Sequence, residues 1–386
     1  MTKMASIPFV LFAFVAACSS STGAAPGADA GPDGTPPGNG DNCPAGTASC
    51  NGAADTKCET SVGGSDVNNC GACGRVCQGC KDGQCPLTTL AMNQNYARDI
   101  AVDAQDVYWT VEQDGVVRKA PISGGASTDL ASNQNIPLGI AVDGKNVYWT
   151  TQGTDPNYTD ATVMSVPLGG GTSAMLAQNQ LQTEHLALGG SNLFWINQGT
   201  NPALTGGSLM KSGLDGSGAM ALASNLNNAN FVAVDAEYAY FTTAGTQAMS
   251  NNDGVVARVP IAGGAVQMLA SNQAAPWSIA VDDSNVYWTS SVASGSVMMV
   301  PKGGGTPTAL SKGEKRPNGI YVDAANVYWT DLDGGTVMRV AKTGGHVTTI
   351  ATGQNWPESV IVDATNVYWT CRGTDNSDGT VMRAPR

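Results

Sequence analysis

The sequence is poor in charged residues, in aromatic residues and in histidine. Charged side chains make up 13% and aromatic ones 6% of the 386 residues, and there are only two histidines. Helical proteins are rich in Glu, Lys, Ala and Leu, whereas this chain has 48 glycines, which favour tight turns between strands. The net charge of −12 opposes contact with phosphate backbones. The composition therefore predicts an all-β protein that does not bind nucleic acid.

The sequence also lacks an apolar run long enough to cross a bilayer, which takes about 20 residues in a helix. The run 7–17 is shorter and follows Lys3, which is the pattern of a signal peptide. Its end, "VAAC" at 15–18, resembles a bacterial lipobox. That resemblance implies that residues 1–17 are removed and that the acylated Cys18 anchors the protein in the membrane; a non-Asp residue after it implies the outer membrane. The alternative is an ordinary signal peptide with an incidental Cys.

Residues 18–42 begin with Cys18 and continue without any large apolar side chain, so we expect a flexible tether. A cysteine-rich stretch follows at 43–85, and its short length in an exported chain predicts a disulfide-stapled module. The pairing of its cysteines stays open. Their Cys-x-x-Cys spacing could also hold zinc, although export favours disulfides. The eight residues are Cys43, Cys50, Cys58, Cys70, Cys73, Cys77, Cys80 and Cys85.

The scarce aromatic residues are concentrated in pairs that recur along the rest of the chain. The second member of each pair follows the previous one by 40–47 residues, and a period of that length with short strands is typical of propeller blades. The seven pairs are Tyr108-Trp109, Tyr148-Trp149, Phe194-Trp195, Tyr240-Phe241, Tyr287-Trp288, Tyr328-Trp329 and Tyr368-Trp369.

Each copy contains four apolar or β-branched runs separated by Gly, Asp and Asn, which predicts four antiparallel strands, a to d. Typical runs are "GIAVD" (139–143), "NVYWT" (146–150) and "TVMRV" (336–340). The last copy has no run for strand d, while "PLTTLAMNQN" (86–95) precedes the first copy and matches that run. We therefore predict a seven-bladed β-propeller over 86–386, closed by the N-terminal strand in the last blade.

The "NVYWT" and "GIAVD" segments resemble the YWTD and NHL classes of propeller over the whole repeat region. YWTD propellers usually have six blades, so seven copies are a departure. Only Asp331 keeps the Asp that follows Thr in those proteins, and the other copies have different residues at that place. Their receptor-style binding of partners is therefore not carried over to this chain.

Two repeated features are predicted to be structural. Neighbouring residues of a strand point to opposite faces, so each aromatic pair should wedge between the preceding and the following blade. Aromatic side chains bury the largest areas, and repetition in every blade is what packing requires. The Asp of "AVD" should accept N–H bonds in the a–b turn. Its copies are Asp103, Asp143, Asp235, Asp282, Asp323 and Asp363, with Gly189 in the third blade.

Function is expected where the copies differ. Two adjacent positions at the start of strand a vary without pattern, and the d–a and b–c connections should open on one face around the channel mouth. The longer b–c loops of copies two to four should crowd the same face. Exposed aromatic and polar groups there suit a glycan, peptide or protein ligand, and drift in solvent-exposed loops is the alternative. The candidate residues are Arg98, Asp99, Glu184, His185, Asn230, Phe231, Trp277, Asn318, Trp356 and Glu358.

The rival hypothesis is an enzyme that resembles metal-dependent lactonase or lyase propellers, with Glu184, His185, Glu358 and Asp99 at the mouth. The other histidine, His346, falls in a c–d turn, which should lie on the opposite face. A metal site needs three or four converging ligands, and no nucleophile motif is present, so we expect neither metal nor other cofactor. The segments 331–335 and 375–379 are predicted to be hairpin turns rather than calcium loops.

Cys371 is isolated from the other cysteines and should be a buried, unpaired thiol, with a bond to the cysteine module as the alternative. Taken together, the sequence predicts an outer-membrane lipoprotein. A tether and a disulfide module would present a propeller that binds a ligand at its channel mouth.

Overall fold

The computed structural model describes residues 47–48, 60–61, 86–246, 251–374 and 377–386. The predicted signal peptide, Cys18, the tether and all eight cysteines of the module lie outside the described residues, as does part of the 375–379 turn. Two short strands, β1 (Thr47–Ala48) and β2 (Thr60–Ser61), pair with each other in the 43–85 region. Within the described residues, no helix is long and apolar enough to span a membrane.

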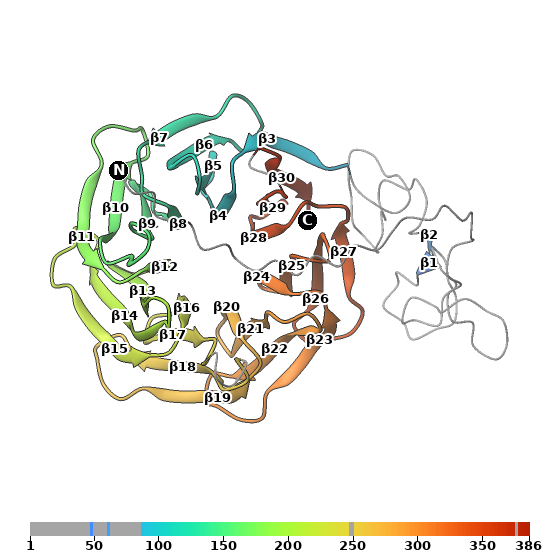
Figure 1. The fold of residues 1–386 in the computed structure, drawn as a ribbon. Coiled ribbons are helices and arrows are strands. Elements are labelled where there is room, and N and C mark those ends of the chain that lie inside the picture. Colours follow the sequence, from blue (N-terminus) through green and yellow to red (C-terminus); the bar gives the residue numbers. More distant parts are fainter. Residues whose placement is uncertain (1–46, 49–59, 62–85, 247–250, 375–376) are drawn as a thin grey trace, which may run out of the picture.

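The propeller consists of seven four-stranded antiparallel sheets arranged in a ring (Figure 1). The innermost strands, a, are β4 (Ala97–Val102), β8 (Pro137–Val142), β12 (Thr183–Gly189), β16 (Ala229–Val234), β20 (Pro276–Val281), β24 (Pro317–Val322) and β28 (Pro357–Val362). The b strands are β5 (Asp106–Val111), β9 (Asn146–Thr151), β13 (Asn192–Thr200), β17 (Tyr238–Thr243), β21 (Asn285–Ser290), β25 (Asn326–Asp331) and β29 (Asn366–Cys371).

The two outer strands of each blade continue the same order. The c strands are β6 (Val116–Pro121), β10 (Ala161–Pro167), β14 (Thr205–Gly213), β18 (Gly254–Pro260), β22 (Gly295–Pro301), β26 (Thr336–Ala341) and β30 (Gly379–Pro385). The outermost d strands are β7 (Thr128–Ala131), β11 (Ala174–Gln180), β15 (Met220–Leu226), β19 (Gln267–Gln273), β23 (Thr308–Glu314), β27 (Thr348–Ala351) and β3 (Thr88–Gln94).

The N-terminal strand closes the ring as predicted. β3 pairs antiparallel with β30, so the last blade has the order β28-β29-β30-β3. Thr88 lies opposite Arg383 in this ladder, which brings the start and the end of the propeller chain into one sheet (Figure 1). The seam gives the last blade its fourth strand and so joins the two ends of the propeller chain.

The aromatic pairs form the core between blades. Tyr108 packs with Ile140 and Trp149 of the next blade, whereas Trp109 packs with Tyr368 of the preceding one. Six Trp and six Tyr side chains are the largest fully buried groups of the described chain. The prediction that the pair wedges in both directions is confirmed, because adjacent residues of a strand point to opposite faces.

The Asp of each a–b turn accepts the two N–H bonds expected of it and a third bond that the repeat alone did not predict. In the fifth blade, Asp282 accepts from the backbone N–H groups of Ser284 and Asn285 and from the hydroxyl of Tyr287 at 2.9 Å. The ammonium of Lys342, from the next blade, lies 2.7 Å away. Burial opposes the charged form, but these bonds lower the pKa of Asp282 to about 2.

The remaining structural predictions concern turns and Cys371. His346 lies in the β26–β27 connection and is exposed, and residues 331–335 form the β25–β26 hairpin. Cys371 ends β29 as a free thiol that is 1% exposed, and burial raises its pKa to about 11. Cys371 is thus buried as expected.

Candidate functional site

A β-bulge starts strand a in every blade, and it contains the two variable positions. In the first blade Ala97 pairs with Val111 and Ile100 with Trp109, so Arg98 and Asp99 face the single residue Thr110. The same shift occurs in all seven a–b ladders. A bulge releases side chains from the alternation of a regular strand and turns them in a new direction. We call these seven pairs of residues the bulge ring; its pairs are 98–99, 138–139, 184–185, 230–231, 277–278, 318–319 and 358–359.

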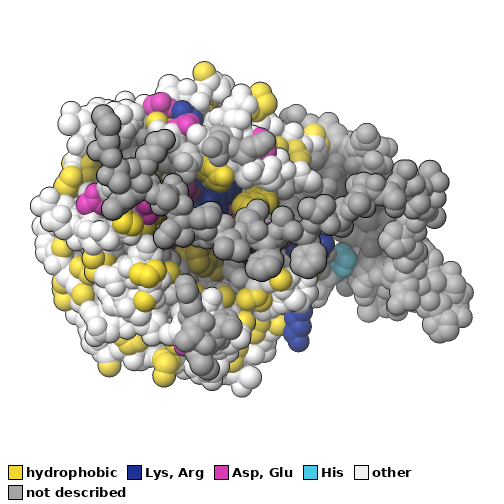
Figure 2. Space-filling view, in the orientation of Figure 1, with side chains coloured by type: hydrophobic (Ala, Val, Ile, Leu, Met, Phe, Trp, Pro, Cys, Tyr) yellow, Lys and Arg dark blue, Asp and Glu magenta, His cyan; other side chains and the backbone are white. Residues whose placement is uncertain are grey.

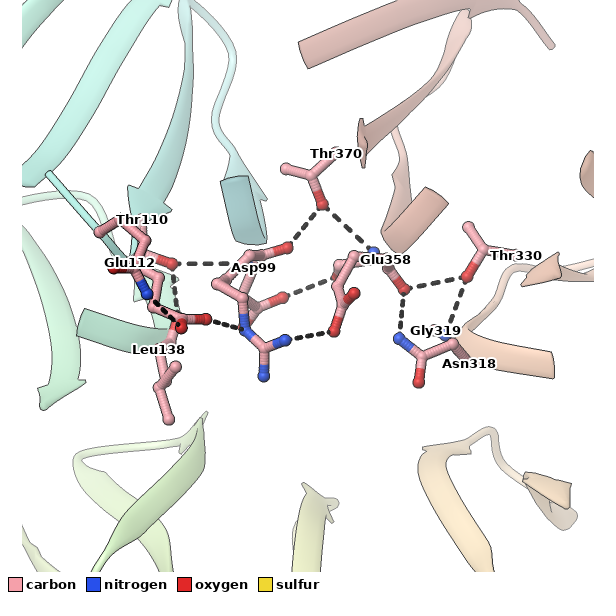
Figure 3. A network of polar contacts seen from close by, with 12 residues as sticks. Asp99, Thr110, Glu112, Leu138, Asn318, Gly319, Thr330, Glu358 and Thr370 are labelled. Atoms are coloured by element: carbon pink, nitrogen blue, oxygen red, sulfur yellow. Dashed lines mark hydrogen bonds and ion pairs between the residues drawn. The ribbon is translucent and has the colours of Figure 1, made fainter. Parts of the chain in front are cut away.

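The Thr of "YWT" joins each bulge to the bulge of the next blade. Thr370 accepts a bond from the N–H of Ser359 in its own blade and donates one, at 2.5 Å, to the carbonyl of Arg98 in the first blade. Thr330 likewise links Gly319 to Glu358 (Figure 3). The third blade has Ile196 instead of Thr, and there the side chain of Asn230 bonds to Gln198 and to the carbonyl of Pro276. The bulge ring is therefore held by a nearly continuous chain of bonds.

The d–a and b–c connections lie on the same face, as predicted. The N–H of Gln182, just before β12, donates to Tyr158 in the long loop of the second blade, and Asn228 bonds in the same way to Leu204 in the third. The side chain of Asn201 also donates to the carbonyl of Pro156 at 3.0 Å. The loops of the second and third blades thus crowd together on one side of the mouth.

Seven of the ten predicted residues line one cavity at the mouth. Its volume is about 30 Å³, enough for one small group, and it adjoins a central channel of about 430 Å³ lined by the a strands. The lining residues are Arg98, Asp99, Leu138, Gly139, Glu184, His185, Phe231, Asn318, Gly319, Glu358 and Ser359. Figure 2 shows acidic, basic and hydrophobic side chains together near the middle of one face of the ring.

Three predicted residues do not line this cavity. Asn230 is fully buried and acts in the bond chain described above. Trp277 lies behind the wall, with its ring 5.9 Å from that of Phe231. Trp356 is 37% exposed and lies between the guanidinium groups of Arg316 and Arg372, 5.5 and 5.9 Å from its ring. It precedes the bulge in the left-handed conformation (φ 52°), as does the equivalent residue of every other blade.

Arg98 is the centre of a network of carboxylates (Figure 3). Its guanidinium lies 2.8 Å from Glu358 Oε1 and 3.4 Å from Glu112 Oε2, and all three side chains are less than one-fifth exposed. Burial lowers the pKa of Arg98, but the surrounding carboxylates outweigh burial and raise it. Arg98 therefore stays charged. Glu358 Oε2 is buried and has no bonding partner in the described chain.

Glu112 was not predicted, although it completes this network. It follows strand b in the first blade, where the equivalent residue of the last blade is Arg372. A charge at a position that is otherwise filled by Gln, Ala, Ser or Leu was the signal that could have identified it.

Glu184 and His185 occupy the bulge of the third blade. Glu184 is 9% exposed, and burial raises its pKa to about 7, with Arg98 opposing and Glu112 and Glu358 adding to the rise. Burial lowers the pKa of His185, against the effect of Asp99. Its Nε2 lies 3.6 Å from Asp99 Oδ2, so a neutral imidazole faces a carboxylate at neutral pH.

Asp99 of the first blade accepts hydrogen bonds from the second and the last blade and so connects three blades. One oxygen accepts from the hydroxyl of Ser359 at 2.7 Å, and the other from the N–H of Ile140 at 3.0 Å. On the opposite wall, the rings of His185 and Phe231 are stacked with centroids 4.4 Å apart. The mouth thus combines an apolar wall with three lining carboxyl groups and one guanidinium, an arrangement that can bind a ligand with both an apolar part and hydrogen-bond donors.

No family model matches the chain, and no curated protein matches it. Among solved structures, virginiamycin B lyase from Staphylococcus aureus superposes with a TM-score of 0.61 and 11% identity, covering 78% of this chain and 98% of that one. The WD40 β-propeller domain of Doa1 superposes with a TM-score of 0.60 and 14% identity, covering 77% and 95%. At these identities the likeness concerns the fold, which is a β-propeller.

Proposed function

We propose that this protein is a bacterial lipoprotein of the outer membrane whose propeller binds a ligand at the channel mouth. The observation that carries the binding function is the cavity within the bulge ring. Residues from six blades converge there although the rest of each blade follows the repeat. Loops and bulges on a rigid scaffold are common places for binding groups. The ligand is a glycan, a peptide or a protein.

The partly buried polar groups favour binding over drift in loops. A drifting solvent-exposed loop has no reason to hold Arg98, Glu358 and Glu184 away from water, since burying charges costs free energy unless they are paired. Here one carboxylate oxygen remains unpaired in a cavity that opens at the mouth. Keeping such groups requires a compensating benefit, and recognition of a ligand would supply it.

The binding function is tested with the full chain purified in detergent. Its melting temperature is recorded against a panel of glycans, cell-wall fragments and peptides, in parallel with the double variant Trp277→Ala, Glu358→Ala. A ligand that raises the midpoint of the wild type and not that of the variant supports the proposal. A ligand that stabilises both proteins equally would place binding elsewhere and contradict it.

The membrane anchor rests on the lipobox alone and has its own test. Cells that express the chain are labelled with a radioactive fatty acid, and Cys18→Ser is the matched control. Label in the wild type, recovered with outer membranes and absent from Cys18→Ser, is the expected result. Equal labelling of both proteins, or none in either, would contradict acylation at Cys18.

A second candidate is catalysis at the same site. It is favoured by Glu184, whose pKa near 7 suits a general acid or base, and by the contact of His185 with Asp99. In the part of the chain that the structure describes, no three or more His, Cys, Asp or Glu side chains come together as a metal site. Turnover of a lactone or glycan that His185→Ala abolishes, with the fold intact, would support it.

A further inference from the structure

The charges around the mouth do not balance. Asp99, Glu184 and Glu358 line the cavity together with one cation, Arg98, and Glu112 adds a further carboxylate behind it. Arg98 can neutralise one of these groups. Carboxylates held close together and away from water repel each other, and either a proton or a cation relieves that repulsion.

The excess of negative charge at the mouth is greatest at Glu184. It is 9% exposed, and no described residue bonds to its carboxyl group, whereas the Asp99 carboxylate accepts bonds from Ile140, Ser359 and the N–H of Ile100. Nearby, Glu358 Oε2 is a buried oxygen without a partner in the described chain. The two groups belong to blades three and seven, and they meet only because their bulges direct them to the same cavity.

The remaining surroundings define what can enter. The cavity of about 30 Å³ takes one group of the size of an ammonium ion. Phe231 and Leu138, which also line it, offer apolar surface to an alkyl stem, as does the stacked ring of His185. A bulky sugar ring exceeds this volume, and a carboxylate or phosphate would meet three carboxyl groups.

We propose that the mouth takes the ammonium group of an alkylamine, as presented by a lysine side chain of a polypeptide ligand. The ammonium lies between the Glu184 carboxylate and Glu358 Oε2, and the stem lies against Phe231 and Leu138. This inference rests on the proposed binding function and specifies its ligand. A polypeptide is the source because the cavity is too small for one free ligand to bury much surface, while the surrounding face and its long loops can contact the rest of a chain.

Binding is coupled to the charge of Glu184. The groups that face it are Arg98 of β4, Glu112 after β5 and Glu358 of β28, with His185 beside it in β12. Since burial raises the pKa of Glu184 to about 7 in the ligand-free protein, binding of the ammonium displaces a proton below that pH. Affinity should therefore rise about tenfold from pH 6 to pH 8, with release of up to about one proton at the lower pH.

The test is calorimetric titration of the full chain in detergent with butylammonium chloride, at pH 6 and pH 8 in two buffers of different ionisation enthalpy. Sodium butyrate and 1-butanol are the control ligands. We expect butylammonium to bind, about tenfold more tightly at pH 8, and to lose at least tenfold in affinity in Glu358→Gln and in Glu184→Gln, with the pH dependence abolished in the latter. Glu237→Gln removes an exposed carboxylate from the opposite face and should bind as the wild type does.

Several outcomes would overturn the inference. One is tighter binding of butyrate or butanol than of butylammonium. Another is equal affinity for butylammonium in the wild type, Glu184→Gln and Glu358→Gln. Each variant is first checked for an unchanged melting profile. A blocked Gly-Lys-Gly tripeptide extends the test, with its acetyl-lysine form as control. Binding of the tripeptide tenfold weaker than that of butylammonium would exclude a polypeptide source.

The outcomes also separate this inference from the proposed function. If a neutral glycan or an acidic peptide binds and the Trp277→Ala, Glu358→Ala variant loses it, the mouth binds a ligand but not the one inferred here. If butylammonium and every member of the panel act equally on wild type and variants, both proposals fail.

Discussion

The a–b turns and the bulge ring lie at opposite ends of the same a strands, and they behave in opposite ways. At the turns, six blades repeat one Asp with nearly the same bonds. In the bulge ring the backbone repeats, with the same register shift in every blade, while the side chains differ from blade to blade. The repeat therefore fixes backbone positions everywhere but fixes side chains only where the neighbouring blade requires a particular shape.

The largest loss of stability is expected when a repeated aromatic residue of the core is removed. Trp149 is fully buried between blades, so Trp149→Ala should lower the free energy of unfolding by about 3–5 kcal/mol. Trp356→Ala is the matched control, because that ring is partly exposed and lies near two arginine side chains; its cost should stay within about 1 kcal/mol. Denaturant unfolding measures both, and equal losses would contradict the distinction.

Loss of a turn carboxylate should have the next largest effect. Asp282→Asn weakens bonds to Tyr287 and Lys342 and should cost about 2 kcal/mol at pH 7, whereas the exposed neighbour changed in Asp283→Asn should cost under about 0.5 kcal/mol.

The two variants should also differ in their acid dependence. Because the pKa of Asp282 is lowered to about 2 in the folded state, its stabilisation is present above its ordinary midpoint near 3.8 and is lost as pH falls through about 2. The free energy of unfolding of Asp282→Asn should therefore fall less than that of the wild type between pH 5 and pH 2, as measured by denaturant unfolding. An equal decrease in the free energy of unfolding of both proteins over this pH range would refute the role given to Asp282.

The sixth blade sharpens the comparison, because it departs from the repeat inside the structural region. In four blades a Gln side chain accepts the indole N–H of the core Trp, as Gln354 does for Trp369 at 2.9 Å. In the sixth blade Glu314 accepts it and lies beside Asp331. Burial and Glu314 raise the pKa of Asp331 to about 8, and Asp331 Oδ1 is buried without a partner in the described chain.

Glu314→Gln restores the residue of the other blades and should stabilise the protein at pH 8 by about 1–2 kcal/mol, with little gain at pH 5. Folded Asp331 keeps its proton up to about pH 8 whereas the unfolded residue loses it near 3.8, so stability of the wild type falls as pH rises between these values. The variant should show a flatter profile. Urea unfolding at the two pH values checks this, and the same gain at both would contradict it.

The smallest effect is expected at the Thr that joins the two regions. Thr370→Val removes the bonds to Ser359 and to the carbonyl of Arg98 and should cost about 1 kcal/mol, since Ile196 shows that one blade accepts an apolar residue there. The control is Thr306→Val, since Thr306 is exposed and its side chain makes no bond to the described residues. If this bond positions the bulge that carries Arg98, Thr370→Val should also weaken ligand binding. Weaker binding with an unchanged free energy of unfolding would contradict the stabilising role of the bond.

The sequence allowed the blades, the wedge and the closing strand to be predicted because each depends on local patterns that recur. The mouth was predicted only in part. The variable positions were identified, but the bulge that brings Glu184 and Glu358 together is a feature of the backbone with no residue signature of its own. Trp356 was assigned to the mouth because aromatic residues suit ligands, but its ring lies near Arg316 and Arg372 and does not line the cavity. The ion pair of Arg98 with Glu112 joins the bulge of β4 to the residue after β5, so it depends on the same bulge.

The closing strand also determines how the molecule responds to force. The chain enters the propeller through β3, whose first residues pair with the last residues of β30, and β30 is its single neighbour in the sheet. A pull on the segment ahead of Leu87 therefore loads this ladder from its end and opens its bonds one after another, rather than shearing them together. Tension on the N-terminal side would detach β3 first. The last blade would lose its outer strand, and the first blade would lose the bonds that Trp109 and Arg118 make to Gln94.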